Sequence, residues 1–256
     1  MRMERSYYAD HYENQGYVIF DYPNEYFKAI HNGFTQVISQ SCDFIEDFSD
    51  LSAIFQDPCF YGEPINKIRK SVIDGLCRDP NFTNLYFKIF SEPLFELLGP
   101  DIVQQRVPNF SIQIPHDETS VLSLHCDSMQ GNSIFELVGW LPLTDCWSTN
   151  SMFLLDISEL GNQTQLLNEY IARGDGDLFQ AVKNKGKFLE LKKGQGLIFN
   201  QNLLHGNVVN TTSSTRISFN CRFKNLFSPY GEKDLLNFFE IVSTSPVSKL
   251  ATRCDW

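Results

Sequence analysis

The chain has 256 residues, and its 42% hydrophobic and 14% aromatic content is typical of a folded globular protein and excludes a mainly disordered one. Its 21 Lys and Arg residues against 31 Asp and Glu residues give a net charge of −10. An acidic chain lacks the broad positive field that nucleic-acid binding requires, so we expect no nucleic-acid partner.

The cysteines and the N-terminal residues both indicate in which part of the cell the protein is found. The seven cysteines include no C-x-x-C pair, which disfavours a disulfide framework and a thiolate zinc site. Residues 1–15 are polar where a secretory signal would be apolar, and no apolar run approaches the roughly 18 residues of a membrane span. We expect a cytoplasmic protein with no membrane partner.

The first part of the chain, about residues 1–105, is predicted to hold one strand and supporting helices. Residues 16–20, Gly-Tyr-Val-Ile-Phe, are largely aromatic and β-branched, which is typical of a strand. From Asn24 to about Gly99, apolar residues recur at helical spacing between breakers. We expect these helices to pack outside the main sheet.

Short apolar or alternating runs replace the helical spacing after Pro108, and they predict a β core over about residues 106–225. The predicted strands lie at 110–114, 121–124, 137–141, 152–155, 188–191, 197–199 and 215–223. Helices followed by many short strands favour a mainly β fold with two antiparallel sheets and flanking helices over an alternating βαβ fold. We therefore expect a single domain spanning 1–256.

Two segments lie outside this predicted core. A polar insertion at 157–187 carries a predicted helix at 165–173 and a Gly-Asp-Gly turn at 174–176. The last part, about 226–256, is predicted to be a helix that starts near Glu232, followed by a tail.

One group of side chains has the composition of a metal site. His125 and Asp127 follow a predicted strand, and residues two apart on a strand project from the same face, with Cys126 facing away. His205 follows another predicted strand. Two imidazoles and one carboxylate form the facial triad of non-haem Fe(II), which leaves three coordination positions open. We therefore expect an open divalent metal site.

Arg216, within the predicted strand 215–223, indicates which metal this is. A fixed guanidinium can bind the far carboxylate of a 2-oxoacid in a bidentate manner while the oxoacid chelates iron. Structural interpretations also stand at this point, because strand histidines are often core residues and strand arginines often pair with an acidic neighbour. Trp140 either packs in the β core or lines the cavity.

Several segments resemble the phytanoyl-CoA dioxygenase-like branch of the Fe(II)/2-oxoglutarate oxygenases. They are F-S-I-Q-I-P at 110–115, L-H-C-D at 124–127, G-W-L-P-L-T-D at 139–145, N-S-M at 150–152, K-G-Q-G-L-I-F-N-Q-N-L-L-H-G-N at 193–207 and R-I-S at 216–218. Within that branch, the chain is most similar to bacterial members associated with carbohydrate-biosynthesis gene clusters.

The resemblance implies a double-stranded β-helix, or jelly-roll, core with the N-terminal helices outside. It implies that His125, Asp127 and His205 bind Fe(II), and that 2-oxoglutarate and dioxygen are the cosubstrates. The implied reaction is hydroxylation, or another oxidation, of a C–H bond in a small polar metabolite, with a sugar or sugar nucleotide as the leading candidate.

Further residues take roles from the same resemblance. Arg216 would bind the C5 carboxylate of 2-oxoglutarate, and Ser218, on the same strand face, would add a hydroxyl. Gln113 would hydrogen-bond the cosubstrate or the substrate. The family's usual Pro-Gly-Ser-His stretch is replaced by L-D-I-S-E at 155–159, so the resemblance does not extend to the loop that frames the substrate pocket.

Two other functions remain open from the sequence. One is a metal-dependent cupin-type isomerase or epimerase that does not use 2-oxoglutarate, for which Arg216 would have no purpose. The other is a non-catalytic β-sandwich binding protein in which the triad is coincidental.

Overall fold

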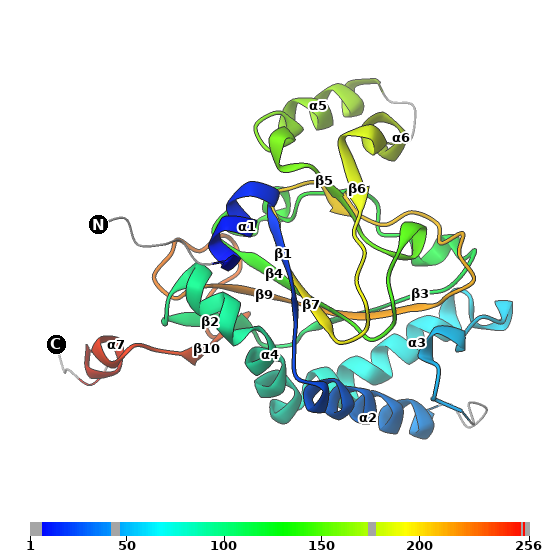
Figure 1. Cartoon of the computed structure of the whole chain (residues 1–256), viewed down its shortest axis with the longest axis horizontal. Helices are drawn as coiled ribbons and strands as arrows, with labels where there is room; N and C mark the ends of the chain where they lie inside the picture. The colour runs from blue at the N-terminus through cyan, green and yellow to red at the C-terminus, as the bar shows by residue number, and fades with distance from the viewer. Residues whose placement is uncertain (1–6, 42–46, 174–177, 252, 254–256) are drawn as a thin grey trace.

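The protein consists of two antiparallel β-sheets, with helices packed outside the larger sheet (Figure 1). The structure is a computed structural model that describes residues 7–41, 47–173, 178–251 and 253. This arrangement confirms the predicted mainly β fold class with flanking helices. Within the described residues, no helix is long and apolar enough to cross a membrane.

The larger sheet carries most of the strands. In order across the sheet they are β1 (Tyr17–Asp21), β7 (Gln195–Asn200), β4 (Leu137–Pro142), β9 (Arg216–Asn225), β2 (Ile102–Gln105) and β10 (Phe239–Ser243). β3 (Asn109–Gln113) also pairs with β9, beside β2. Because β9 is long, it contacts β4 along one edge and both β2 and β3 along the other.

The smaller sheet lies across from the larger one. It consists of β6 (Gly186–Phe188), β5 (Phe153–Leu155) and β8 (His205–Gly206), all antiparallel. An isolated bridge between His125 and His205 adds the segment before residue 127 to this sheet.

Helices from the first third of the chain cover the outer face of the larger sheet, and two further helices lie beyond the smaller sheet (Figure 1). The α-helices are α1 (Tyr7–Gln15), α2 (Asn24–Ser41), α3 (Glu63–Val72), α4 (Pro80–Leu98), α5 (Gln163–Arg173), α6 (Leu178–Val182) and α7 (Pro246–Ala251), and a π-helix (Ile73–Cys77) continues α3. Short 3-10 helices lie at Leu51–Ala53, Pro58–Phe60, Glu118–Ser120, Asp127–Gln130, Ser148–Asn150, Ile157–Glu159 and Lys183–Lys185.

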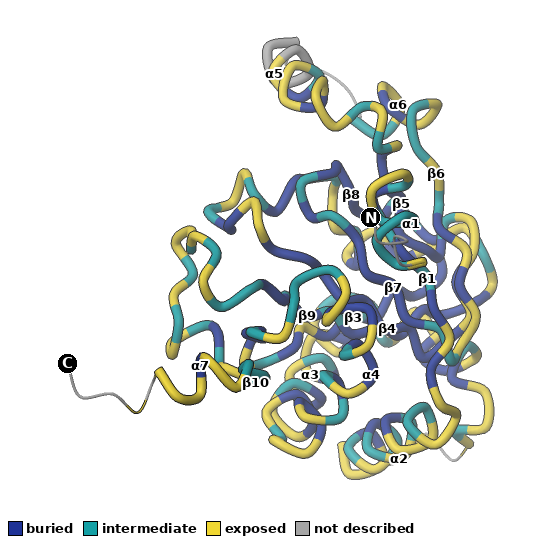
Figure 2. The backbone as a smooth tube through the Cα atoms, turned by 60° about the vertical axis from the view of Figure 1, so that its left-hand side comes forward, coloured by how far each residue is buried: buried dark blue, intermediate teal, exposed yellow. Residues whose placement is uncertain are grey.

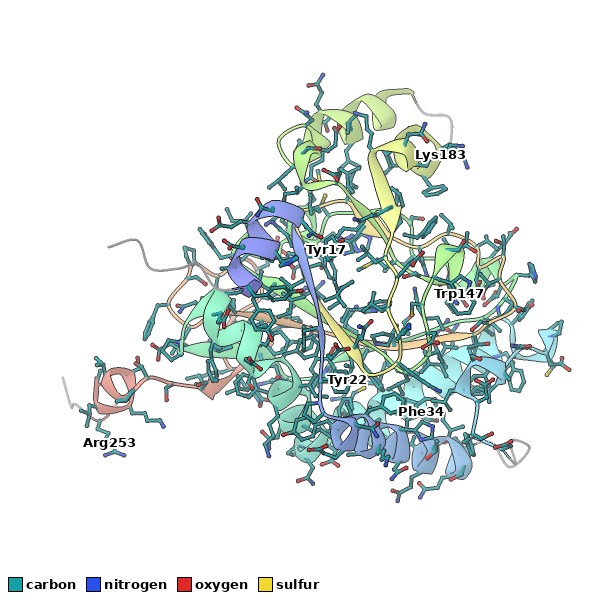
Figure 3. All side chains as sticks on the ribbon, viewed as in Figure 1. Tyr17, Tyr22, Phe34, Trp147, Lys183 and Arg253 are labelled. Atoms are coloured by element: carbon teal, nitrogen blue, oxygen red, sulfur yellow. The ribbon has the colours of Figure 1, made fainter. Side chains whose placement is uncertain are left out.

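The main hydrophobic core lies between α2, α3, α4 and the larger sheet. Phe34 of α2 is fully buried, and Figure 3 labels it where α2 faces the strands. The rings of Tyr86 and Phe90 stack at 5.0 Å, and the Tyr86 hydroxyl donates a hydrogen bond of 2.9 Å to the Gly139 carbonyl of β4. The buried residues run along the strands, while the outer helix surfaces are exposed (Figure 2). This packing leaves the opposite face of β4 and β9 free to line a cavity.

Several predicted elements agree with the structure. The strand at 16–20 is β1, the helix that starts at Asn24 is α2, and the helix at 165–173 is α5. The strands predicted at 110–114, 137–141, 152–155, 197–199 and 215–223 correspond to β3, β4, β5, β7 and β9. The predicted turn at 174–176 lies outside the described residues.

Three predictions are wrong. Residues 121–124 form no strand. The first residue in this region to pair is His125, in an isolated β-bridge with His205. The strand predicted at 188–191 ends at Phe188. The helix predicted from Glu232 is replaced at 239–243 by β10, which pairs with β2 and buries Phe239 completely. Backbone pairing at a sheet edge therefore prevails over helical spacing in the C-terminal part.

Candidate metal centre

A cavity of about 230 Å³ opens between the two sheets and contains all three predicted metal ligands. Its wall is formed by β3, β4, β7 and β9 of the larger sheet and by the residues around His125 and His205. Because the helices cover the other face of the larger sheet, the cavity lies on the face that they leave free.

The two histidines are fixed by a pair of backbone hydrogen bonds. The N–H of His125 donates to the carbonyl of His205 at 2.9 Å, and the N–H of His205 donates back at 2.9 Å. The two rings lie 4.5 Å apart between centroids. Residues far apart in the chain are therefore held side by side, and both imidazoles face the cavity.

Each imidazole is also held in one tautomer. Nδ1 of His125 lies 2.8 Å from the Ser123 carbonyl, and Nδ1 of His205 lies 2.8 Å from the Leu203 carbonyl. A carbonyl oxygen only accepts hydrogen bonds, so each Nδ1 carries a proton. Nε2 is consequently the atom that each ring can offer to a metal, which is the arrangement that metal-binding histidines require.

Asp127 completes a group of three donors. Its Oδ1 lies 3.4 Å from Nε2 of His125, and its Oδ2 lies 3.8 Å from Nε2 of His205. One donor atom from each of the three residues lies within 4.8 Å of the others. Two imidazole nitrogens and one carboxylate oxygen suit a divalent transition metal, and the geometry fits such an ion.

The pKa values of two of these groups suit metal binding at neutral pH. Burial alone would raise the pKa of Asp127, but its hydrogen bond with His125 and the charges of His205 and Arg222 lower it to about 2. Complete burial lowers the pKa of His205 to about 4, although the charge of Asp127 opposes this shift. Asp127 is therefore ionised and His205 neutral, as ligands must be.

Arg216 lines the same cavity. Its guanidinium is buried, and within the described part of the chain no carboxylate pairs with it. Nη2 is 3.2 Å from the Ser111 hydroxyl, whereas Nε has no partner, and neither does the buried hydroxyl of Ser218. Burial lowers the pKa of Arg216 to about 10, which leaves it cationic at neutral pH. This arrangement fits an incoming carboxylate.

Searches for related proteins point to one class of fold. The sequence matches no protein-family model and no curated protein. Among solved structures, HygX from Streptomyces hygroscopicus with nickel and 2-oxoglutarate bound is similar with a TM-score of 0.59 and 14% identity, over 90% of each chain. The nickel complex of the non-haem monooxygenase ThoJ gives 0.54 and 16%, over 93% of this chain and 84% of that one. EctD from S. alaskensis with 2-oxoglutarate and 5-hydroxyectoine gives 0.55 and 13%, over 87% and 76%.

The chain has the fold of these solved structures. The two sheets are accordingly the halves of a jelly-roll core, as the predicted fold class requires. In this fold, His125 and Asp127 share a cavity with His205, but not because they alternate along a strand. Asp127 instead begins a short 3-10 helix, and its N–H donates to the Gln201 carbonyl at 3.2 Å.

Of the other residues considered in the sequence analysis, Trp140 lines the cavity, whereas Gln113 and Cys126 do not. Trp140 is buried, lines the cavity and lies 5.7 Å from the Arg216 guanidinium, so it both packs and contributes to the wall. Gln113 is not among the residues that line the cavity. Its amide donates to the backbone carbonyl of Val208, which favours a structural role that links β3 to the segment after β8. Cys126 packs in a hydrophobic cluster with Phe153, and burial raises its pKa to about 11.

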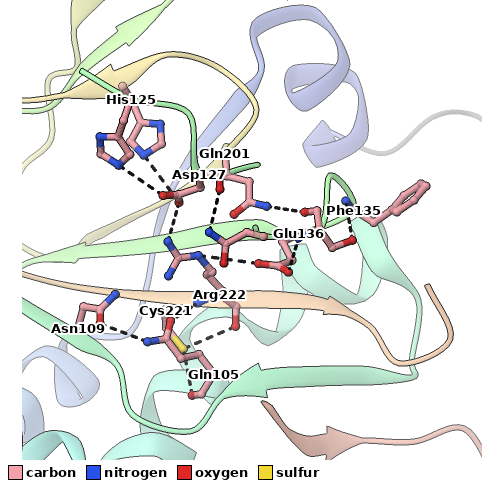
Figure 4. Close-up of polar contacts among 12 residues, drawn as sticks. Gln105, Asn109, His125, Asp127, Phe135, Glu136, Gln201, Cys221 and Arg222 are labelled. Carbon is pink, nitrogen blue, oxygen red and sulfur yellow. Dashed lines mark hydrogen bonds and ion pairs between the residues drawn. The ribbon is translucent and has the colours of Figure 1, made fainter. Parts of the chain in front are cut away.

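The sequence analysis missed two charged residues beside the predicted metal ligands. Nη2 of Arg222 lies 2.9 Å from Oδ2 of Asp127, and Nε lies 3.8 Å from the buried carboxylate of Glu136 (Figure 4). The alternation along β9 could have identified Arg222, because it places residues 216, 218, 220 and 222 on one strand face. No pattern in the sequence connects Glu136 with that face.

Proposed function

We propose that the protein is an Fe(II)- and 2-oxoglutarate-dependent oxygenase that oxidises a C–H bond of a small polar metabolite. The observation that supports this most directly is the shared cavity of three ligand donors and a buried, unpaired arginine. When bound, Fe(II) and 2-oxoglutarate supply the oxidising equivalents from dioxygen, and succinate and carbon dioxide are released. HygX and EctD, which share the fold, have structures with 2-oxoglutarate bound.

The side chains of the cavity would divide this work between them. His125, Asp127 and His205 hold the metal; the carbonyls of Ser123 and Leu203 orient the two imidazoles, and Asp127 is ionised and His205 neutral before the metal binds. Arg216 binds the distal carboxylate of 2-oxoglutarate, assisted by the hydroxyl of Ser218. The β walls position the two substrates and exclude bulk water from the reacting atoms.

The remaining lining favours a neutral, hydroxylated substrate such as a sugar. Asn109 of β3 and Asn220 of β9 are directly opposite each other in the strand register, and both line the cavity. Carboxamides donate and accept hydrogen bonds, which suits hydroxyl groups. The two cavity arginines are accounted for, since Arg216 is assigned to the cosubstrate and Arg222 is paired with Asp127.

Anaerobic titration followed by a product assay tests the proposal. The wild-type protein is expected to bind one equivalent of Fe(II), and to bind 2-oxoglutarate only when metal is present. A panel of sugars, sugar nucleotides and other polar metabolites is then screened for stimulated succinate formation in air. His205→Ala should lose metal binding and turnover while remaining folded, with Phe227→Ala at an exposed position as the control. Turnover retained by His205→Ala contradicts the proposal.

The two alternative functions give different results in the same experiments. A cupin-type isomerase would be as active with Zn(II) as with Fe(II) and would ignore 2-oxoglutarate, whereas an oxygenase is inhibited by Zn(II), Co(II) or Ni(II). A non-catalytic binding protein would take up no stoichiometric metal. The unpaired Arg216 favours the oxygenase over both.

A further inference from the structure

We propose that Arg222, which has Glu136 on its other side, is a positioning residue that holds Oδ2 of Asp127 so that Oδ1 is the oxygen offered to the metal. This inference rests on the proposed function, because it concerns the coordination of the metal in that site. It assigns a purpose to a charged pair that the proposed reaction does not otherwise use.

The contact between Arg222 and Asp127 is short and sheltered. Nη2 of Arg222 lies 2.9 Å from Oδ2, and the side chains are 16% and 5% exposed. Oδ1 of the same carboxylate is 3.4 Å from Nε2 of His125. The two carboxylate oxygens therefore differ in their nearest neighbours. Oδ2 contacts the guanidinium and lies farther, at 3.8 Å, from Nε2 of His205, whereas Oδ1 has, among the described residues, only the His125 nitrogen beside it (Figure 4).

Glu136 faces the guanidinium from its other side, within ion-pair distance but without a hydrogen bond. Glu136 is 1% exposed and directly precedes β4, and its Oε1 accepts a hydrogen bond of 2.9 Å from the N–H of Ser133. Its Oε2 lies 3.8 Å from Nε of Arg222. The guanidinium carries one positive charge and lies between two carboxylates, so the negative charge of Glu136 balances it. The carboxylate of Asp127 therefore keeps its negative charge for the metal. Strand register adds a further constraint, because Arg222 is directly opposite Val138 of β4.

The orientation of Asp127 matters because of the number of coordination positions. A facial triad leaves three positions open, and a bidentate cosubstrate and dioxygen together need all three. If Asp127 bound the metal through both oxygens, it would occupy one of them. A hydrogen bond that holds Oδ2 away from the metal keeps this position available. Outer partners of metal-binding carboxylates commonly act in this way.

Co(II) is the probe that tests this inference, because its visible absorption bands report coordination number without any turnover. The wild-type protein, Arg222→Ala, Arg222→Lys, Glu136→Gln and the double variant Arg222→Ala/Glu136→Gln are each titrated with Co(II) by calorimetry and absorption. Arg106→Ala is the matched control, since Arg106 forms an exposed ion pair with Glu240 at 3.7 Å. Circular dichroism establishes that each variant is folded, and the double variant avoids leaving one buried charge unpaired.

We expect Arg222→Ala and the double variant to bind Co(II) about 10- to 100-fold more weakly and with altered absorption bands. Glu136→Gln should change the Co(II) affinity and the absorption bands in the same direction but by less. Arg222→Lys should bind Co(II) more tightly than Arg222→Ala and more weakly than the wild-type protein. Wild-type affinity and bands in both Arg222→Ala variants would overturn the inference and leave the proposed function intact. No Co(II) binding by the wild-type protein would overturn both.

Discussion

At the scale of single residues, the candidate site is prepared before any ligand arrives. The backbone two residues before each histidine fixes the tautomer, and the neighbouring charges keep Asp127 ionised. Two of the buried polar atoms that lack partners lie where the cosubstrate would bind, on Arg216 and Ser218. Because a buried unpartnered polar group costs free energy, its presence in a cavity indicates a ligand that satisfies it.

Replacing Arg216 should affect 2-oxoglutarate far more than the metal. Arg216→Lys keeps the charge but loses the bidentate geometry, and Arg216→Ala loses both, so affinity should fall in that order. A hydrogen bond to a charged group contributes about 1.5–3 kcal/mol, so the alanine variant should bind 2-oxoglutarate roughly 10- to 100-fold more weakly. Calorimetry on the Co(II)-loaded protein measures this, and unchanged affinity in Arg216→Ala would remove the role assigned to Arg216.

Replacing Ser218 should weaken the binding of 2-oxoglutarate without destabilising the protein. Its buried hydroxyl has no partner, so Ser218→Ala should leave the free energy of unfolding of the ligand-free protein unchanged or slightly raised. Its affinity for 2-oxoglutarate should fall about tenfold, because one hydrogen bond to the carboxylate is lost. Urea unfolding and calorimetry measure the two effects, and a destabilised variant with normal affinity would instead indicate a structural hydroxyl.

At the scale of elements, β9 connects the core to the site. One face of the strand packs Ile217, Phe219 and Phe223 against the helices, and the alternate residues face the cavity. The same strand pairs with β2, β3 and β4, so its register is fixed from both sides. The positions of Arg216 and Arg222 therefore depend on how the helices pack against the opposite face of the sheet.

Truncating a side chain at this helix–sheet contact should lower stability strongly. Phe34→Ala removes a fully buried ring of α2 that lies 5.7 Å from the ring of Phe110 in β3. Such changes cost about 3–5 kcal/mol, to be compared with about 0.5 kcal/mol or less for Phe227→Ala at an exposed site. Chemical denaturation measures both values. A loss below 1 kcal/mol would mean that α2 is only loosely packed on the sheet.

At the scale of the whole molecule, the cavity joins parts of the chain that are remote in sequence. The proposed metal ligands come from the segment between β3 and β4 and from β8, while the residues proposed to bind the cosubstrate come from β9. A ligand that bridges these parts binds the folded state alone. Ligand binding and global stability should therefore be linked.

Metal with cosubstrate should raise the melting temperature of the whole protein. At one hundred times the dissociation constant, a ligand stabilises the folded state by about 2.7 kcal/mol, which corresponds to roughly 5–10 °C for a chain of this size. Thermal melts with Co(II) and 2-oxoglutarate, anaerobically, measure the shift, and a chelator should reverse it. His205→Ala should show no shift, and an equal shift in that variant would place the ligands elsewhere.

Local patterns in the sequence were sufficient for much of the fold and for the composition of the site. Short apolar runs marked β4 and β7, period-two alternation marked β9, and helical spacing marked α2, because these patterns lie within a few neighbouring residues. The order of His125, Asp127, His205 and Arg216 indicated a metal and a carboxylate from residue chemistry alone. These properties depend on residue type and spacing, which the sequence contains directly.

Tertiary structure decided what depends on pairing between distant segments. The segment at 239–243 became β10 because the edge of β2 was available to it, and residues 121–124 formed no strand although their pattern is apolar. The contacts of Arg222 with Asp127 and Glu136 depend on the register of β9 against β4, which no local pattern records. A cavity exists only when both sheets and their loops are in place, so its charge arrangement follows from the folded chain.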